Sequence, residues 1–122
     1  LRAIPILDRF VLVEFSLALP PPNLKEQLRK LIDDGFVPII AHVERYVWLD
    51  PKHALVHKLK EMGCLLQGNV EAVESGAALP YLEAELLDIL ATDNHGNERL
   101  PLSLVQTMEK WPFVKKRMEE IW

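Results

Sequence analysis

The residues in this chain best suited to chemistry are two carboxylates and two histidines. Asp93-Asn94-His95 places a carboxylate and an imidazole two positions apart, so in an extended segment or turn both can reach one cation. With Glu14 and His42 they form the mixed oxygen and nitrogen donor set that suits zinc, manganese or iron. Such an ion lowers the pKa of bound water to about 7 and so supplies hydroxide at neutral pH. The set predicts a metal-dependent hydrolase.

Two arginines accompany these candidate ligands. Arg45 follows one histidine by three residues, and Arg99 follows the other by four. Guanidinium groups bind phosphate oxygens in bidentate fashion and stabilise the charge that develops in phosphoryl transfer. The arginines therefore favour a phosphoester over a peptide as substrate. The aromatic residues Tyr46 and Trp48 are expected to border the same site.

Short apolar runs must bring these residues together. Four of them have the composition of parallel strands covered on both faces: Phe10–Phe15, Phe36–His42, Cys64–Asn69 and Leu87–Asp93. Each run turns polar at its carboxyl end, where Glu14, His42, Gln67, Asn69 and Asp93 lie. In parallel α/β folds these ends share one edge, where active sites assemble. Pro38 is an objection, because a central strand loses a ladder hydrogen bond at proline.

Helical segments separate the runs. Asn23 and Glu26 predict a capping box for a helix that Gly35 ends in a left-handed conformation. Asp50 and Pro51 predict the start of the next helix. Further helices are expected over 79–86, 101–110 and 113–122. Strands and helices alternating in this way predict a parallel sheet or part of a (β/α) barrel.

Composition narrows the class of protein. The chain has 122 residues, 49% hydrophobic and 26% charged, which fits one domain. A net charge of −4 with no basic stripe argues against nucleic acid as a partner. No apolar stretch approaches the ~20 residues of a membrane span, since Glu14 interrupts the longest. The single Cys64 rules out an internal disulfide, and with no visible secretory signal the expected location is the cytoplasm.

Simpler interpretations compete with the metal site. Asp93 can cap a turn beside a solvated His95, His42 can be a core histidine, and Glu14 can be the first exposed residue after a strand. Their position at successive strand ends favours the site.

Other chemistry is less favoured. His53 and His57 have helical zinc spacing but are more simply an exposed helix face. Cys64 is expected to be a small buried hydrophobe. Val70 stands where the cysteine-phosphatase pattern C-x5-R needs arginine, and no G-x-S-x-G elbow or Walker-type loop occurs.

The segments that carry these residues resemble a known family. Residues 35–46, GFVPIIAHVERY, are similar to the G-(Y/F)-x-P-I-(I/L)-A-H-P-E-R-Y signature of bacterial PHP-superfamily tyrosine phosphatases of the capsular and exopolysaccharide biosynthesis type. VLVEF at 11–15, GCLLQGN at 63–69 and TDNHG at 92–96 with Arg99 resemble the L-(I/V)-E-F, G-x-x-x-Q-x-N and (S/T)-D-x-H-(N/G)…R segments of that family, in the same order.

The resemblance implies a distorted (β/α)7 barrel with up to three metal ions, commonly manganese or iron. It implies that hydroxide attacks phosphotyrosine, typically on an autophosphorylating tyrosine kinase that controls polysaccharide export. The matching metal ligands are Glu14, His42, Asp93 and His95, and the matching phosphate-binding residues are Arg45 and Arg99.

Departures from the family pattern qualify this expectation. No H-x-H metal motif precedes the first ligand, the segment 70–86 is short, and Val43 replaces a proline. We therefore interpret 1–122 as a single domain, the C-terminal portion of a PHP-type (β/α) barrel with about four parallel strands and covering helices, in which activity is impaired. Open sheet edges predict either that the natural chain continues upstream or that it associates with itself.

Three hypotheses follow. The first is a metal-dependent protein-tyrosine phosphatase. The second is a non-catalytic PHP remnant or binding module. The third is another PHP phosphomonoesterase such as a histidinol phosphatase, from which the AHVERY stretch points away.

Overall fold

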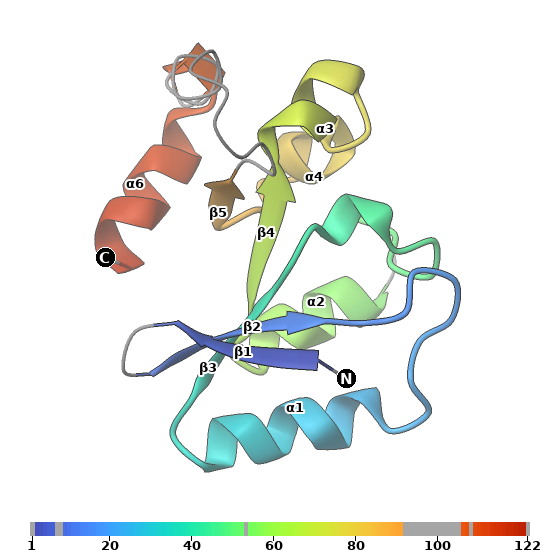
Figure 1. Ribbon diagram of the computed structural model, residues 1–122. Coiled ribbons are helices and arrows are strands. Elements are labelled where there is room, and N and C mark those ends of the chain that lie inside the picture. The colour runs from blue at the N-terminus through green and yellow to red at the C-terminus, as the bar shows by residue number, and fades with distance from the viewer. Residues whose placement is uncertain (1, 7–8, 53, 92–105, 108, 122) are drawn as a thin grey trace.

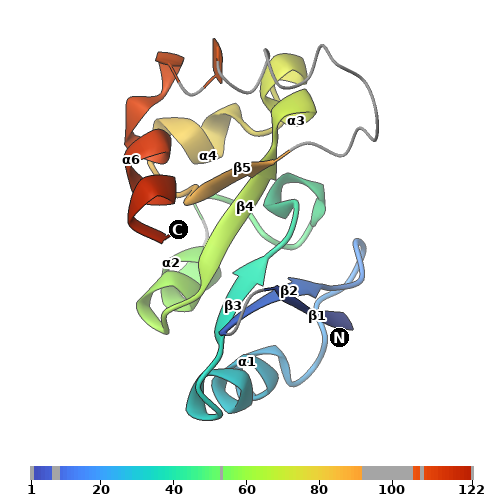
Figure 2. The same ribbon diagram turned by 60° about the vertical axis from the view of Figure 1, so that its left-hand side comes forward.

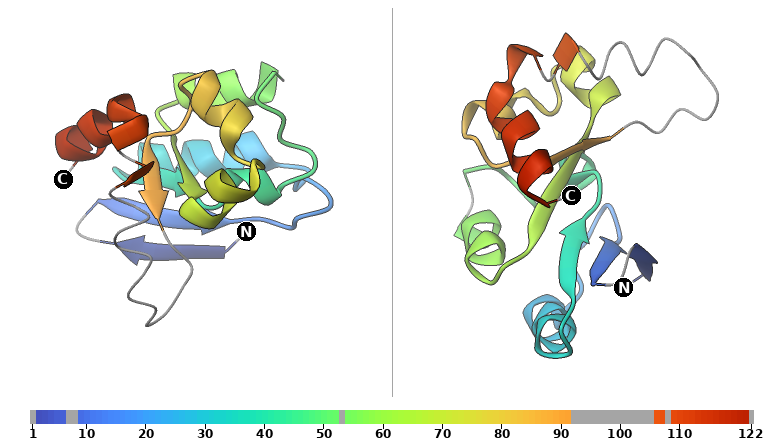
Figure 3. Two further views of the ribbon diagram at one scale, coloured as in Figure 1. Left: turned by 90° about the horizontal axis from the view of Figure 1, so that it is seen from above. Right: turned by 90° about the vertical axis from the view of Figure 1, so that its left-hand side faces the viewer.

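The chain forms a five-stranded sheet with helices around it (Figure 1 and Figure 3). The computed structural model describes residues 2–6, 9–52, 54–91, 106–107 and 109–121. The strand order is β1-β2-β3-β4-β5. The strands are β1 (Arg2–Ile6), β2 (Phe10–Glu14), β3 (Val37–Ile40), β4 (Leu65–Asn69) and β5 (Ile89–Ala91). Strands β2 to β5 run parallel, which confirms the four predicted strands, although β3 is shorter than expected and β5 begins two residues later.

Strand β1 was not predicted. It pairs antiparallel with β2, with Arg2 opposite Glu14 and Ile6 opposite Phe10. Proline is tolerated in an edge strand, where a missing N–H leaves no ladder bond unmade, and Pro5 lies in this one. The outer edge of β2, expected to be open, is thus hydrogen-bonded to β1.

Six helical segments connect or flank the strands. They are α1 (Leu24–Asp33), the 3-10 turn η1 (Val43–Arg45), α2 (Ala54–Glu61), α3 (Val70–Ser75), α4 (Leu79–Glu83) and α6 (Pro112–Ile121). Helix α6 contacts β5, and α3 and α4 lie beyond the carboxyl end of β4 (Figure 2). Within the described residues, no helix has the length and apolar character needed to cross a membrane.

The helix ends differ from the sequence prediction in detail. The side chain of Asn23 makes no capping hydrogen bond, so the predicted capping box does not form. Gly35 does adopt the expected left-handed conformation, with φ of 95°. Asp50 accepts a hydrogen bond from the backbone of Lys52 at 2.8 Å, which makes a turn, and α2 begins only at Ala54. Helix α3 was missed, and most of the predicted helix 101–110 lies outside the described residues.

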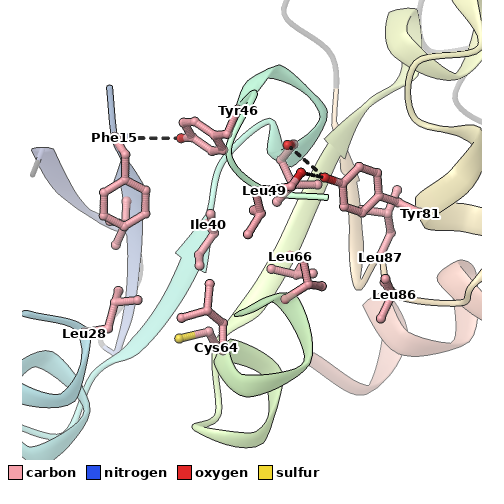
Figure 4. Packing of buried hydrophobic residues seen from close by; sticks show 14 of the residues in the cluster. Phe15, Leu28, Ile40, Tyr46, Leu49, Cys64, Leu66, Tyr81, Leu86 and Leu87 are labelled. Atoms are coloured by element: carbon pink, nitrogen blue, oxygen red, sulfur yellow. Dashed lines mark hydrogen bonds between the residues drawn. The ribbon is translucent and has the colours of Figure 1, made fainter. Parts of the chain in front are cut away.

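The core lies on the face of the sheet that the helices cover (Figure 4). Alternate strand residues Val11, Val13, Ile40, Leu66 and Leu90 join this cluster, as a period of two requires. The intervening residues Phe10, Ile39 and Ile89 form a smaller cluster on the other face. The strands are therefore apolar on both faces, which explains their continuous hydrophobic runs.

Pro38 fits in β3 because the N–H groups of the neighbouring residues that bond to β2 belong to alternate positions. The backbone N–H groups of Val37 and Ala41 donate to β2, at Arg9 O (2.8 Å) and Val13 O (3.0 Å). Alternate residues of a strand donate to opposite sides, so the missing N–H of Pro38 faces β4. Pairing between β3 and β4 begins only at Ile39. The proline therefore removes no ladder bond that this sheet makes.

Candidate active site

Two of the predicted metal ligands end neighbouring parallel strands. Glu14 is the last residue of β2, and His42 lies two residues beyond the end of β3. The strands are in register, with Val13 opposite Ile40, and Ala41 N donates to Val13 O at 3.0 Å. Both candidate ligands are half-buried. The structure therefore confirms that these two strand ends lie on one edge of the sheet, while joint metal binding by Glu14 and His42 stays a prediction.

The backbone of His42 is held in an unusual conformation. Its φ of 36° and ψ of 58° are left-handed, a region that L-residues other than asparagine, aspartate and histidine seldom enter. The His42 N–H donates to Gln67 Oε1 at 3.0 Å, and its carbonyl accepts from Arg45 N at 3.0 Å. The sequence marked Gln67 only as a polar strand residue and gave it no role. A polar residue within an otherwise buried strand was the available signal.

Aromatic rings border the His42 side chain. The Tyr46 ring centroid lies 5.5 Å from that of His42 and 5.0 Å from that of Trp48. The Tyr46 hydroxyl accepts a hydrogen bond from Phe15 N at 3.2 Å (Figure 4). Trp48 Nε1 donates to Ser16 O at 2.9 Å. Burial raises the pKa of Tyr46, so its hydroxyl stays neutral at physiological pH. These bonds fasten the segment after β2 to the segment after η1.

Arg45 is exposed at the end of η1, beside the carboxyl end of β4. With Glu44, Asn69, Glu71 and Ser75 it lines a hollow of about 270 Å³. The Asn69 side chain is almost fully buried, and Asn69 N donates to Glu44 Oε1 at 3.4 Å. The carboxylates of Glu44 and Glu71 in this lining outnumber the one guanidinium, so the hollow itself does not favour an anion, and only the exposed guanidinium of Arg45 is suited to phosphate.

Asp93, His95 and Arg99 lie outside the described residues. Strand β5 ends at Ala91, which is opposite Asn69 in the parallel pairing with β4. The carboxyl end of β5 therefore shares an edge with the ends of β2 and β3. In the part of the chain that the structure describes, no three His, Cys, Asp or Glu side chains are grouped closely enough to hold a metal ion. Glu14 and His42 are of the donor types, carboxylate and imidazole, that manganese, iron or zinc accepts.

The remaining candidates are structural. Cys64 is 2% exposed, and burial raises the pKa of its thiol to about 12, which confirms a buried hydrophobe and excludes a reactive thiolate.

His57 is exposed on α2, and His53 is outside the described residues. A hollow of about 380 Å³ touches the amino-end residues Phe10, Val37 and Leu65, away from Glu14 and His42.

Comparison with known proteins gives a consistent match. The sequence profile of the family described as capsular polysaccharide synthesis, CpsB/CapC, matches residues 6–121. The tyrosine-protein phosphatase CpsB of Streptococcus pneumoniae is 29% identical, over 88% of this chain and 50% of the relative. CpsB of Streptococcus agalactiae is 28% identical, over 87% of this chain and 49% of the relative. The chain thus spans about half the length of the curated relatives it matches.

The fold is shared with a solved structure. A chain from crystal structures of YwqE from Bacillus subtilis and CpsB from Streptococcus pneumoniae, described as unique metal-dependent tyrosine phosphatases, aligns with a TM-score of 0.64 at 25% identity. The alignment covers 73% of this chain and 39% of that chain. The α/β fold with four parallel strands predicted from the sequence corresponds to part of that structure.

Proposed function

Because the chain belongs to the CpsB/CapC family of capsular polysaccharide synthesis proteins, we propose that it acts as a metal-dependent protein-tyrosine phosphatase. The observation that chiefly supports this is the placement of Glu14 and His42 at the ends of adjacent parallel strands. The curated relatives named tyrosine-protein phosphatase add support from sequence.

The proposed metal ligands are Glu14, His42, Asp93 and His95, and the proposed metal is manganese, with iron or zinc as fitting alternatives. A bound ion of this kind supplies hydroxide from water at neutral pH. The chain's own part is to hold these donors in place and to bind the phosphoryl oxygens through Arg45 and Arg99.

The aromatic residues beside His42 favour an aryl phosphoester. The half-buried ring of Trp48, which packs at 5.0 Å against the buried ring of Tyr46, offers an apolar surface against which a phenyl ring can pack. The neutral Tyr46 hydroxyl adds no negative charge that would repel a phosphate. Phosphotyrosine combines the two groups, a phosphate for the arginines and a phenyl ring for the aromatic residues.

The proposed partner is a phosphotyrosine protein, a bacterial tyrosine autokinase that controls polysaccharide export, and the proposed location is the cytoplasm. Neither nucleic acid nor membrane insertion is part of the proposal, in keeping with the net charge of −4. Self-association would use the outer edges of β1 and β5, which have no strand neighbour among the described residues.

The test is hydrolysis of p-nitrophenyl phosphate and of a phosphotyrosine peptide, with and without manganese, together with metal analysis of the purified chain. We expect turnover that requires the metal and falls at least about 100-fold in His42→Ala, because a ligand is lost. His57→Ala, which removes an exposed histidine from α2, is the matched control and should leave turnover unchanged.

Three outcomes would contradict the proposal. Turnover that needs no metal, or that survives His42→Ala, would overturn the metal mechanism. A folded chain that retains no metal and hydrolyses neither substrate would indicate a non-catalytic remnant or binding module. Preference for histidinol phosphate over the phosphotyrosine peptide would indicate a different phosphomonoesterase.

A further inference from the structure

The hydrogen-bond pattern of β3 leaves one backbone group at the candidate site without a ladder partner. Because Val37 and Ala41 donate to β2, the alternate residues of this strand face β4, and His42 is among them. Pairing between β3 and β4 runs only through Ile39 opposite Leu65 and Ile40 opposite Leu66. The N–H of His42 therefore points toward β4 after the ladder has ended.

A side chain takes the place of the missing ladder carbonyl. Gln67 follows Leu66, the last residue of β4 that pairs with β3. The Gln67 Oε1 accepts a hydrogen bond from the His42 N–H at 3.0 Å, and this bond is partly buried. On the other side of β4, the backbone of Gln67 pairs with β5, where Gln67 lies opposite Ile89. The same residue thus joins the end of β3 to β5.

The bond acts on a strained residue. A left-handed conformation costs free energy at any residue with a Cβ atom, and it persists where surrounding contacts impose it. At His42 these contacts are the Gln67 side chain on the N–H, the Arg45 N–H on the carbonyl, and the Tyr46 ring beside the imidazole. Of the three, only Gln67 comes from a separate strand.

We propose that Gln67 is a positioning residue, whose side-chain carbonyl holds His42 in the left-handed conformation that presents its imidazole to a metal ion. The metal-binding role of the imidazole rests on the proposed function. The hydrogen bond from His42 to Gln67 is observed independently of it. Gln67 acts through His42 and needs no contact with metal or substrate.

The first test measures the bond without a metal. Gln67→Met keeps the length of the side chain and removes the acceptor. We expect amide hydrogen exchange at His42, followed by NMR on the full chain, to accelerate about 10-fold or more, since a protecting hydrogen bond is lost. Gln27→Met is the matched control: Gln27 lies on α1, and its buried Oε1 has no hydrogen-bond partner among the described residues. It should leave exchange at His42 unchanged.

The second test measures how the loss of this hydrogen bond changes metal affinity. We expect the dissociation constant for Mn²⁺, measured by titration calorimetry, to rise about 10- to 100-fold in Gln67→Met and to stay constant in Gln27→Met, as for other groups that orient a metal ligand. If Gln67→Met unfolds, Gln67→Asn gives the same comparison, because its amide is one methylene too short to reach His42 N.

The outcomes separate the two claims. Unchanged exchange at His42 overturns the positioning role and leaves the proposed function standing. Faster exchange with unchanged Mn²⁺ affinity also overturns it, because the bond would then be structural only. A wild-type chain that binds no Mn²⁺ while His42 stays protected refutes the proposed function, and the role of Gln67 in presenting a ligand fails with it.

Discussion

Asp88, the residue before β5, offers a sharp test of what holds the sheet edge in place. Its side chain is only 10% exposed, and Oδ2 accepts hydrogen bonds from Lys60 Nζ at 2.7 Å and from Leu66 N at 2.9 Å. Arg117 Nη1 lies 3.9 Å from Oδ1. The backbone of Asp88 also donates to Leu66 O at 2.9 Å. One carboxylate thus connects α2, β4 and α6 to the start of β5.

The cost of Asp88→Ala can be worked out from these contacts. Leu66 is fully buried, so an N–H left there without an acceptor costs about 1–3 kcal/mol. Removing one partner of a fully buried ion pair costs about 3–5 kcal/mol, but Lys60 is 24% exposed and water recovers part of that. We expect a total loss of about 3–4 kcal/mol in the free energy of unfolding. Asp88→Asn keeps an acceptor for Leu66 and should lose about 1–2 kcal/mol.

The assay is urea unfolding followed by circular dichroism, with equal m-values as the sign that only stability has changed. Lys60→Met, which removes the charge and keeps the stem, completes a double-mutant cycle with Asp88→Asn. The reasoning is refuted if Asp88→Ala costs less than about 1 kcal/mol, the typical worth of a single hydrogen bond. It is refuted equally if Asp88→Ala and Asp88→Asn lose the same amount, because the buried N–H would then carry no penalty.

Two further predictions concern Gly68, near the carboxyl end of β4, and Cys64, directly before its first residue. A Cβ atom added at Gly68 would lie 2.7 Å from Cδ1 of the fully buried Leu87. Gly68→Ala should therefore lower the free energy of unfolding, measured in urea, by about 1–3 kcal/mol. In the double variant, Leu87→Ala should relieve part of this strain, so the two losses should sum to less than their separate values. Burial raises the pKa of Cys64 from 9.0 to about 12, so the unfolded chain loses this proton first as pH rises. The thiol's contribution to stability, complete below pH 9.0, should therefore fall by about 1.4 kcal/mol per pH unit between pH 9.0 and about 12. The free energy of unfolding, measured as a function of pH, should fall less steeply in Cys64→Ala. An equal slope in the two proteins would contradict the claim that the Cys64 thiol causes this pH dependence.

The parts of the fold that the sequence predicted correctly depend on local patterns. Parallel strands covered on both faces leave continuous apolar runs, and the carboxyl ends of such strands must share an edge, so the ends of β2 and β3 were predicted to lie side by side. Strand β1 has no such run: Pro5 interrupts it, and its stability comes from pairing with β2. Asn23 shows the opposite failure, since its type is suited to capping but its side chain makes no capping bond. Gln67 was missed because a bond from a side chain to a distant backbone N–H leaves no periodic trace in sequence.

The same bond explains why an otherwise buried strand ends in Gln67-Gly68-Asn69 while supplying no proposed ligand. Gln67 bonds to the residue after β3, and Asn69 N donates to Glu44 in the following turn at 3.4 Å. All three residues pair with β5, whose continuation leads to Asp93, and any side chain at Gly68 would collide with Leu87. The end of β4 therefore connects the residue after β3 to β5. A change there should move His42 relative to the end of β5 even though no metal donor is altered.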